Sequence, residues 1–371
     1  MFKSAGHSHY LHARQRRWIR RLRRQWWWRL ELPTWGVIAL VYGGWFLTAA
    51  GWRVLGPWLA TPLLILFTTG YLSLQHELIH GHPTRWPRLN QLFGLLPLAV
   101  WYPYGLYRDS HLRHHRNPHL TDPQRDPESY YFTRAQWRRF PRLLPRLTAL
   151  RNCLPGRMLL SPLWDIALLA AGALRRIAAG DRRALAMWLL HGALLAWLLL
   201  WLQRQGIAPW FYLLLVSYPA LAIGKIRSFY EHRAEHEAAA RSVLNEAAWP
   251  WRLLFLNLNY HLVHHDLPGL PWYGLRKVYL AERDAYRQRS QGFVVPGYGS
   301  WFKRHAVTPV DVGVHPFLAG DGGKGNQNAA GATAAIFLTR WKRVLVAFIY
   351  KTKRTTPWHL SPRADAFWRW R

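Results

Sequence analysis

The sequence predicts an all-α integral membrane protein with four transmembrane helices, arranged as two hairpins, and a cytoplasmic helical cap that carries histidine boxes. Three observations predict this class. The chain has four apolar runs of membrane-spanning length, its basic residues are distributed unevenly between these runs, and its histidine clusters all fall on one side of the predicted membrane.

The apolar runs set the number of spans. Four runs are close to the roughly 20 residues that a helix needs to cross a hydrocarbon core of about 30 Å: about 35–52, about 56–75, about 185–203 and about 208–224. Shorter runs at about 92–107 and 159–174 are expected to be re-entrant or interfacial. The sequence therefore predicts two membrane hairpins separated by a long central segment.

The basic residues orient these hairpins. The link between the first two spans contains only Arg53, and the link between the last two contains only Arg204. The N-terminal arm, residues 76–184 and the chain beyond 225 are rich in Arg and Lys, and such segments stay in the cytoplasm. Both termini and the central segment are therefore expected to be cytoplasmic, with the inner membrane of a bacterium as the expected location.

Outside the membrane domain, expected at 33–290, the chain is basic or flexible. Residues 1–32 form a Trp- and Arg-rich arm, which we expect to lie at the membrane interface, with a solvated basic helix as the alternative. An extension (291–318), a Gly-rich flexible linker (319–334) and a basic, amphipathic tail (335–371) follow. The tail is either an interfacial helix or irrelevant to catalysis.

Composition narrows the classes of function. The formal net charge is +32, which suits nucleic acid, an anionic membrane or acidic partners. The chain also has 24 Trp residues and is 50% hydrophobic, so the membrane is favoured and no nucleic acid partner is expected. Cys153 is the only cysteine, which excludes an intramolecular disulfide, a zinc ribbon and a cysteine-ligated iron–sulfur cluster.

Four histidine clusters lie just beyond the spans or in the central segment. They are HELIHGH (76–82), HLRHH (111–115), FYEHRAEH (229–236) and HLVHH (261–265). On the predicted topology all four lie on the cytoplasmic side. Residues three or four apart share one face of a helix, so the histidines of each box are expected to point together into one shared site.

The number of histidines implies two metal ions. A catalytic zinc uses three protein ligands, whereas the HxxxH and two HxxHH boxes offer eight well-spaced imidazoles and His232 makes nine. Imidazole suits zinc, copper, iron and nickel, so ligand type alone does not choose the metal. Half of the 18 acidic residues lie within or beside the clusters, where carboxylates can orient ligands: Glu77, Asp109, Asp122, Asp126, Glu128, Glu231, Glu235, Glu237 and Asp266.

The residues resemble the integral-membrane fatty acid desaturases and hydroxylases, a histidine-box, non-haem di-iron family with an alkene-forming bacterial decarboxylase branch. The resemblance covers about residues 35–285 and includes PYGLYRDSHLRHHRNPHLTDPQRDPESYY (103–131) and NYHLVHHDLPGLPWYGL (259–275). It implies two iron ions held by His76, His80, His111, His114, His115, His232, His261, His264 and His265. Further candidates, as ligands or as partners of ligands, are His82, His236, Glu77, Asp109, Asp126, Glu231, Asp266 and Asn257.

The resemblance implies O₂-dependent oxidation of a long fatty acyl chain that enters from the bilayer. Desaturation is the leading outcome; oxidative decarboxylation of a free fatty acid to a terminal 1-alkene and hydroxylation are alternatives. Trp101, Tyr102 and Tyr104 are candidates for the substrate path or for interface anchors. Arg108, Arg113, Arg227 and Arg233 are candidates to contact an acid head group, a phosphate or solvent.

Electrons must come from an external donor, because the chain has no cytochrome b5-like HPGG, no iron–sulfur cysteines and no GxGxxG in a strand–helix context. A ferredoxin or rubredoxin on the basic face is expected. Two other classes compete: a membrane zinc protease, which would use HELIH alone, and a non-enzymatic metal-binding or transport protein. The latter would place histidines within the spans, where only His191 lies.

Overall fold

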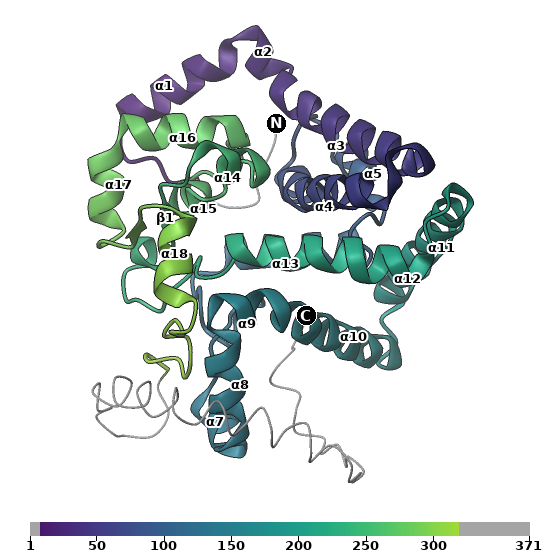
Figure 1. The fold of residues 1–371 in the computed structure, drawn as a ribbon. Coiled ribbons are helices and arrows are strands. Elements are labelled where there is room, and N and C mark those ends of the chain that lie inside the picture. The colour runs from purple at the N-terminus through teal and green to yellow at the C-terminus, as the bar shows by residue number, and fades with distance from the viewer. Residues whose placement is uncertain (1–7, 319–371) are drawn as a thin grey trace. The chain divides into compact units, whose positions relative to one another are not determined.

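The computed structural model describes residues 8–318, nearly all of a compact unit that runs from Met1 to Phe317. The linker and tail predicted at 319–334 and 335–371 lie outside the described residues. Within the described part the chain is mostly helical, as the sequence predicted, and the elements are labelled in Figure 1.

Five stretches of helix are long and apolar enough to cross a membrane, rather than the four predicted. Two are α3 (Leu32–Ala50) and α4 (Trp52–Ile79), and a third is α11 (Arg182–Gln205). A fourth, Pro209–Arg227, is continuous through α12 (Pro209–Phe211), a π-helical turn (Tyr212–Ser217) and α13 (Tyr218–Arg227). The fifth joins α9 (Leu154–Leu159) to α10 (Ser161–Ala178) and contains the run for which an interfacial position was predicted.

Shorter helices surround these spans (Figure 1). Before and between the spans are α1 (Ala13–Arg24), α2 (Trp26–Arg29), α5 (Pro87–Leu95), α6 (Tyr104–Arg116), α7 (Arg134–Arg139) and α8 (Leu143–Arg151). After them come a 3₁₀ turn (Ala238–Arg241), α14 (Trp249–Leu254), α15 (His261–Asp266), α16 (Trp272–Ala281), α17 (Arg283–Arg289) and α18 (Tyr298–His305). Strands β1 (Leu244–Asn245) and β2 (Val294–Val295) pair in parallel, with Leu244 opposite Val294.

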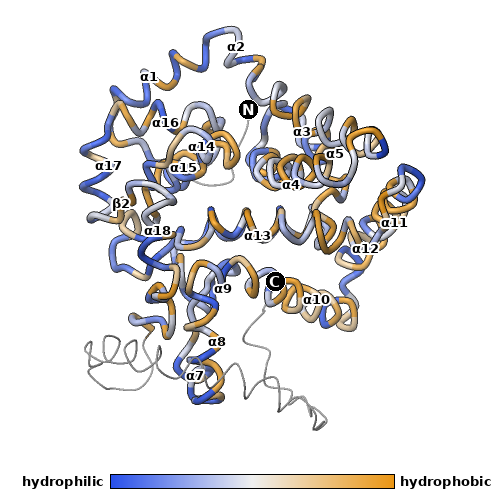
Figure 2. Tube along the Cα trace, viewed as in Figure 1, coloured by the Kyte–Doolittle hydropathy of each residue, from blue (hydrophilic) through white to orange (hydrophobic). Residues whose placement is uncertain are grey.

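The spans pack around buried aromatic residues. Trp45 of α3 and Tyr71 of α4 are fully buried, and the indole N–H of Trp45 donates to the hydroxyl of Tyr212 over 3.1 Å. Leucine and tryptophan side chains stay exposed on the outward faces, for example Trp58 at 94%, as expected for helices that contact lipid. Figure 2 shows the same contrast, with α1 and α17 largely hydrophilic and the long helices largely apolar.

The N-terminal arm packs on α16 and α17. Ile19 of α1 and Trp28 of α2 are 2% and 3% exposed, in one apolar cluster with Leu275 and Val278 of α16. The amide side chain of Gln15 also donates to the hydroxyl of Tyr286 on α17 over 3.2 Å. One face of the arm therefore belongs to the protein interior, and membrane contact by its arginine-rich face stays a prediction.

A strap of residues after α18 returns to the loop between α6 and α7. Phe132 and Val314 form a parallel bridge, and the Val310 N–H donates to the Asn152 carbonyl over 3.0 Å. At its end, His315 Nε2 lies 3.1 Å from Thr121 Oγ1. This strap, residues 306–317, therefore fixes a loop that also contributes to the site.

Candidate metal centre

Four segments bring the predicted histidines together. The last turns of α4 are buried among the neighbouring helices and present His76 and His80. Helix α6 and helix α15 each contribute a complete HxxHH box, and the segment just after α13 contributes His232. All nine imidazoles implied as ligands lie in two groups whose candidate ligand atoms are within 4.8 Å of one another inside each group.

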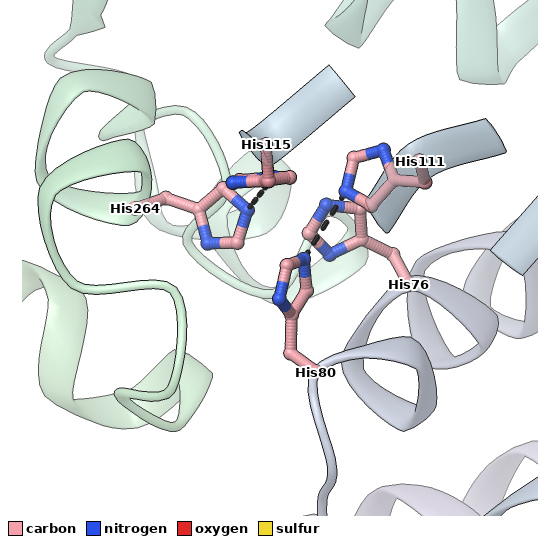
Figure 3. A group of neighbouring side chains, drawn as sticks. All are labelled: His76, His80, His111, His115 and His264. Atoms are coloured by element: carbon pink, nitrogen blue, oxygen red, sulfur yellow. Dashed lines mark hydrogen bonds between the residues drawn. The ribbon is translucent and has the colours of Figure 1, made fainter. Parts of the chain in front are cut away.

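The first group contains five imidazoles: His76, His80, His111, His115 and His264. Figure 3 shows their rings converging from α4, α6 and α15. The Nε2 atoms of His80 and His111 are 3.1 Å apart, and those of His115 and His264 are 3.0 Å apart. Such short separations between nitrogen atoms bring several lone pairs to one point, which is the arrangement that a metal ion requires.

The second group contains four imidazoles: His114, His232, His261 and His265. His232 lies at its centre, with its Nε2 atom 3.1 Å from Nε2 of His114 and 3.0 Å from Nε2 of His261. The Nε2 atoms of His261 and His265 are 3.1 Å apart. The histidine after α13 thus completes a group that the two HxxHH helices begin.

Each HxxHH box is divided between the groups, so the expectation that its three histidines point into one place was wrong. In α6, His111 and His115 enter the first group and His114 enters the second; in α15, His264 enters the first group and His261 and His265 the second. Neighbouring residues of a helix point in directions far apart, whereas residues i and i+4 share a face. The HxxHH spacing therefore lets one helix serve two sites at once.

Carboxylates lie next to the Nδ1 atoms of three of these rings. His114 Nδ1 lies 2.8 Å from Asp126 Oδ1, and His111 Nδ1 lies 3.1 Å from Glu128 Oε1. Glu231 is 3.6 Å from His261 Nδ1. A partner on Nδ1 fixes the ring and leaves Nε2 to face the group. Glu128 was noted only as an acidic neighbour of the boxes, yet it contacts a ring as directly as Asp126 does.

One residue that contacts a histidine ring of the site could not be identified from the sequence. The Nδ1 atom of His232 lies 3.2 Å from the hydroxyl of Ser242, across an antiparallel bridge between these two residues. A serine ten positions away in an irregular segment matches no periodic pattern, because the bridge depends on tertiary folding. The fold alone reveals this contact.

Several predicted residues lie elsewhere. His82 Nδ1 is 2.7 Å from Glu31, the ring of His236 packs on Phe317 with centroids 3.9 Å apart, and neither histidine belongs to a group. The remaining candidates have other partners: Glu77 accepts from the Trp272 N–H, the side chain of Asn257 donates to the Trp272 carbonyl, Asp109 pairs with Arg108 and Arg183, and Asp266 pairs with Arg289. The contacts of these four residues support the frame of the site and do not touch its rings.

The residues predicted for the substrate path have structural contacts of their own. Trp101 packs edge-on against Tyr218, the Tyr102 hydroxyl donates to Gln75 over 3.3 Å, and the ring of Tyr104 fills the space beside Gly94. Among the arginines, Arg227 pairs with Glu231 over 2.6 Å, Arg113 donates to the Asp109 carbonyl and Arg233 donates to backbone carbonyls. Contact with an acyl chain stays a prediction for all of them.

The electrostatics favour neutral rings. Burial, and then the charges of neighbouring imidazoles, hold the pKa of His115, His261 and His265 well below the usual range. A neutral imidazole is the form that binds metal. Burial lowers the pKa of His114 as well, but the charges of Asp126 and Glu128 outweigh it and raise that pKa to about 9, so an ion bound there would displace a proton.

Two buried ring nitrogen atoms have no hydrogen-bond partner in the described part of the chain, which indicates a place for a bound metal ion. Both ring nitrogens of His76 are buried without a hydrogen-bond partner among the described residues, and His76 is 1% exposed. Buried polar groups are nearly always paired. A metal ion in the first group would supply the missing partner, so the residues present fit a metal site.

A sequence model of the fatty acid desaturase family matches residues 50–296, which is more than half of the chain and includes all nine histidines. The chain therefore belongs to the fatty acid desaturase family. A search of curated proteins found no match. Membership of this family, together with the apolar helices, identifies an integral membrane oxidoreductase of fatty acid metabolism. The histidine groups are candidate metal sites within it.

Proposed function

We propose that this protein is a di-iron oxidoreductase that uses dioxygen to oxidise a long fatty acyl chain, with desaturation as the reaction. The observation that carries the proposal is the division of nine buried or half-buried imidazoles into adjoining groups of five and four. One ion cannot use so many ligands, and each group is large enough to hold an ion while leaving a coordination position open. Iron is the metal that the family uses.

The spacing of the nitrogen atoms supports an octahedral metal. With metal–imidazole bonds of about 2.1 Å, ligands at right angles lie about 3.0 Å apart and tetrahedral ligands about 3.4 Å apart. Five contacts between Nε2 atoms measure 3.0–3.1 Å. This spacing is compatible with ligands at right angles around an iron ion in each group.

The position of Glu77 does not suit the general base of a zinc protease. In that class the glutamate of HExxH activates water beside the metal. Glu77 is buried, accepts the Trp272 N–H over 2.8 Å and lies 3.9 Å from His82. This position supports a structural role for Glu77 between α4 and α16.

When bound, two irons would supply the reduction of dioxygen and the removal of hydrogen from an unactivated C–H bond. The protein's own residues position this chemistry. Asp126 and Glu128 orient His114 and His111 through their Nδ1 atoms, and the half-buried pair of Arg227 with Glu231 lies against His261. Burial of the imidazoles excludes bulk water, which would otherwise compete for the open positions.

Convergence of the histidines limits the membrane topology. Between His115 and His232 the chain passes through α10, α11 and Pro209–Arg227, yet Nε2 of His114 and Nε2 of His232 are 3.1 Å apart. A chain that leaves and re-enters one side of a membrane must cross it an even number of times. At most two of these three stretches therefore cross.

Helix α10 is the stretch that we assign to the interface. It contains Asp165, which forms an ion pair with Lys225 of α13, and it ends with Arg175 and Arg176. Charges near the middle of a span are costly. Four crossings, with both ends of the described chain and the histidines in the cytoplasm, then remain as the topology that the parity argument supports.

The arginines near the boxes favour desaturation over decarboxylation. A reaction at the carboxyl carbon would need the acid group held close to the irons by a cation. Arg108 already pairs with Asp109 over 2.9 Å, and Arg227 with Glu231 over 2.6 Å. An acyl chain whose head group stays remote suits this site better, and a small acidic ferredoxin or rubredoxin suits the basic chain as electron donor.

The reaction and the metal are tested together. Membranes containing the protein receive lauric acid, iron, oxygen and a ferredoxin reducing system, and lipid and headspace are analysed. An unsaturated C12 acid, with about two irons per purified chain, is the expected result. Undecene would transfer the assignment to the decarboxylase branch, a hydroxy acid would transfer it to the hydroxylases, and one zinc or no metal would overturn the di-iron proposal.

A further inference from the structure

A cavity of about 310 Å³ lies between α8 and α10, and none of the nine histidines lines it. Its walls are apolar and include Leu147, Leu163 and Trp164. Two of these leucines are also exposed at the surface, Leu147 at 37% and Leu163 at 57%. Because α10 belongs to a stretch apolar enough to cross a membrane, we expect this exposed apolar rim to meet lipid and to admit molecules from the bilayer.

The inner end of the cavity carries a buried positive charge. Arg151 lines it and is 7% exposed, and no carboxylate of the described residues lies within ion-pair distance of its guanidinium. Its contacts are the Tyr130 carbonyl at 3.0 Å, the Asn152 side chain at 3.4 Å and the faces of two aromatic rings. A buried cation without an anion is costly, because no opposite charge offsets the lost hydration.

Two further side chains at this corner have unpaired donor atoms. Thr148 also lines the cavity, is 4% exposed, and its hydroxyl has no hydrogen-bond partner among residues 8–318. Arg157 of α9 is fully buried behind Tyr130, and its Nε and Nη1 atoms have no partner in the same part of the chain. Burial, and then the charge of Arg157, lowers the pKa of Arg151 to about 9, and Tyr130 and Asp165 oppose this shift without reversing it.

We propose that this cavity binds a free fatty acid, with its carboxylate on Arg151 and Thr148 and its chain against the leucines of α8 and α10. The carboxylate would supply an anion in direct contact with Arg151 and an acceptor for the Thr148 hydroxyl, and guanidinium binds carboxylate through two parallel hydrogen bonds. A volume of about 310 Å³ is at the lower end of small-molecule sites, which suits one acyl chain rather than the two of a phospholipid.

The site is separate from the metal centre and does not depend on the proposed reaction. The arginines that the sequence placed near the histidine boxes include two that already pair with carboxylates, Arg108 and Arg227. Arg151 is distinguished from these two by the lack of such a pair, a property that only the fold reveals. The cavity therefore provides a second position for a fatty acid, between α8 and α10.

The test is photolabelling of the purified full-length protein in lipid nanodiscs with a diazirine-bearing palmitic acid, followed by peptide mapping. Saturable labelling of residues 143–167 is expected, and the methyl ester of the probe should label this region about tenfold less, because it lacks the charge that a guanidinium binds. An alkyl phosphate of equal length, used as a competitor, distinguishes a carboxylate site from a general anion site. Competition stronger than that of palmitate would overturn the assignment to fatty acid.

Two variants and a control complete the test. Arg151→Met keeps the apolar stem and removes the charge, so labelling should fall about tenfold; Leu163→Trp fills the cavity and should abolish labelling with Arg151 intact. Arg146→Met alters an exposed arginine of the same helix and should label like the wild type. Equal labelling by acid and ester, or labelling that survives both cavity variants, would show a non-specific lipid contact and refute the site.

Discussion

Asp126→Asn is expected to weaken one half of the metal centre and spare the other. The carboxylate of Asp126 is 1% exposed and accepts three hydrogen bonds. Its Oδ1 atom receives His114 Nδ1 at 2.8 Å and the Glu128 N–H at 3.0 Å, while Oδ2 receives the Thr121 N–H at 2.8 Å. An asparagine has one acceptor oxygen, so its amide N–H₂ must face either the backbone N–H of Thr121 or the ring N–H of His114.

The magnitude follows from these contacts. Leaving a buried donor unpaired costs about 1–3 kcal/mol. Loss of the carboxylate that orients a ligating imidazole lowers metal affinity or activity by about 10–100-fold, or roughly 1.4–2.7 kcal/mol. Because His114 belongs to the group of four imidazoles, we expect purified Asp126→Asn protein to lose iron from that group and keep it in the group of five.

The assay is iron per chain by mass spectrometry, read together with turnover of an acyl substrate. Asp122→Asn is the matched control. Asp122 lies in the same loop, is 8% exposed, and accepts the Gln124 N–H at 2.8 Å through an oxygen that asparagine retains. Iron near two per chain and unchanged turnover in Asp126→Asn would refute the reasoning, as would an equal loss in the control.

Further predictions concern the ligands, topology, packing and pH. His264→Ala and His265→Ala should each abolish activity, yet lower iron in different groups, so Mössbauer spectra of the two variants should differ; identical spectra would contradict the division of the box. Reporters fused at Arg53 or Gln205 should score as extracytoplasmic, and those at Gly180 or Arg304 as cytoplasmic; an extracytoplasmic Gly180 would make α10 a crossing helix. Gly156→Ala should lower the melting temperature, because its Cβ would lie 1.8 Å from the Leu150 carbonyl oxygen; Gly36→Ala, with open space around it, should not. Glu246→Gln should lower the melting temperature at neutral pH. Burial opposes the shift, but Tyr279 and Arg283 hold the pKa of Glu246 below its usual 4.5, so the charged form stabilises the fold above that pH. The difference from wild type should shrink as pH falls below 4.5, and a difference that persists would place the loss elsewhere.

The helical membrane class and the set of nine histidines could be predicted from the sequence, because span length and histidine spacing are local patterns. Span length is set by bilayer thickness, and box spacing by the helical repeat. The group that each part of a box enters could not be predicted, because it depends on how α6 and α15 are rotated relative to α4. His82 illustrates the same limit: it continues the HELIH pattern, but the helix has ended at Ile79 and the ring turns to Glu31.

Tertiary contacts also decide what composition leaves open. The run at 159–174 has too few apolar residues to be counted as a span, but the helical stretch that contains it continues from Leu154 to Ala178. Arg151 is one of 50 basic residues and carries no motif that would distinguish it. Arg151 is distinguished by its contact with the Tyr130 carbonyl and by the cavity beside it, and only folding brings these together.

The strap of residues 306–317 extends the part of the chain that supports the metal centre beyond the segment matched by the family. The family match stops at residue 296, and every imidazole of the centre precedes that point. Yet His315 holds Thr121, whose N–H donates to Asp126, which in turn orients His114. A chain shortened to the matched segment would keep its full set of ligands and lose the outermost link of this relay. A segment chosen for expression should therefore extend to at least residue 317. The family match ends about twenty residues earlier and omits the strap that holds the loop between α6 and α7.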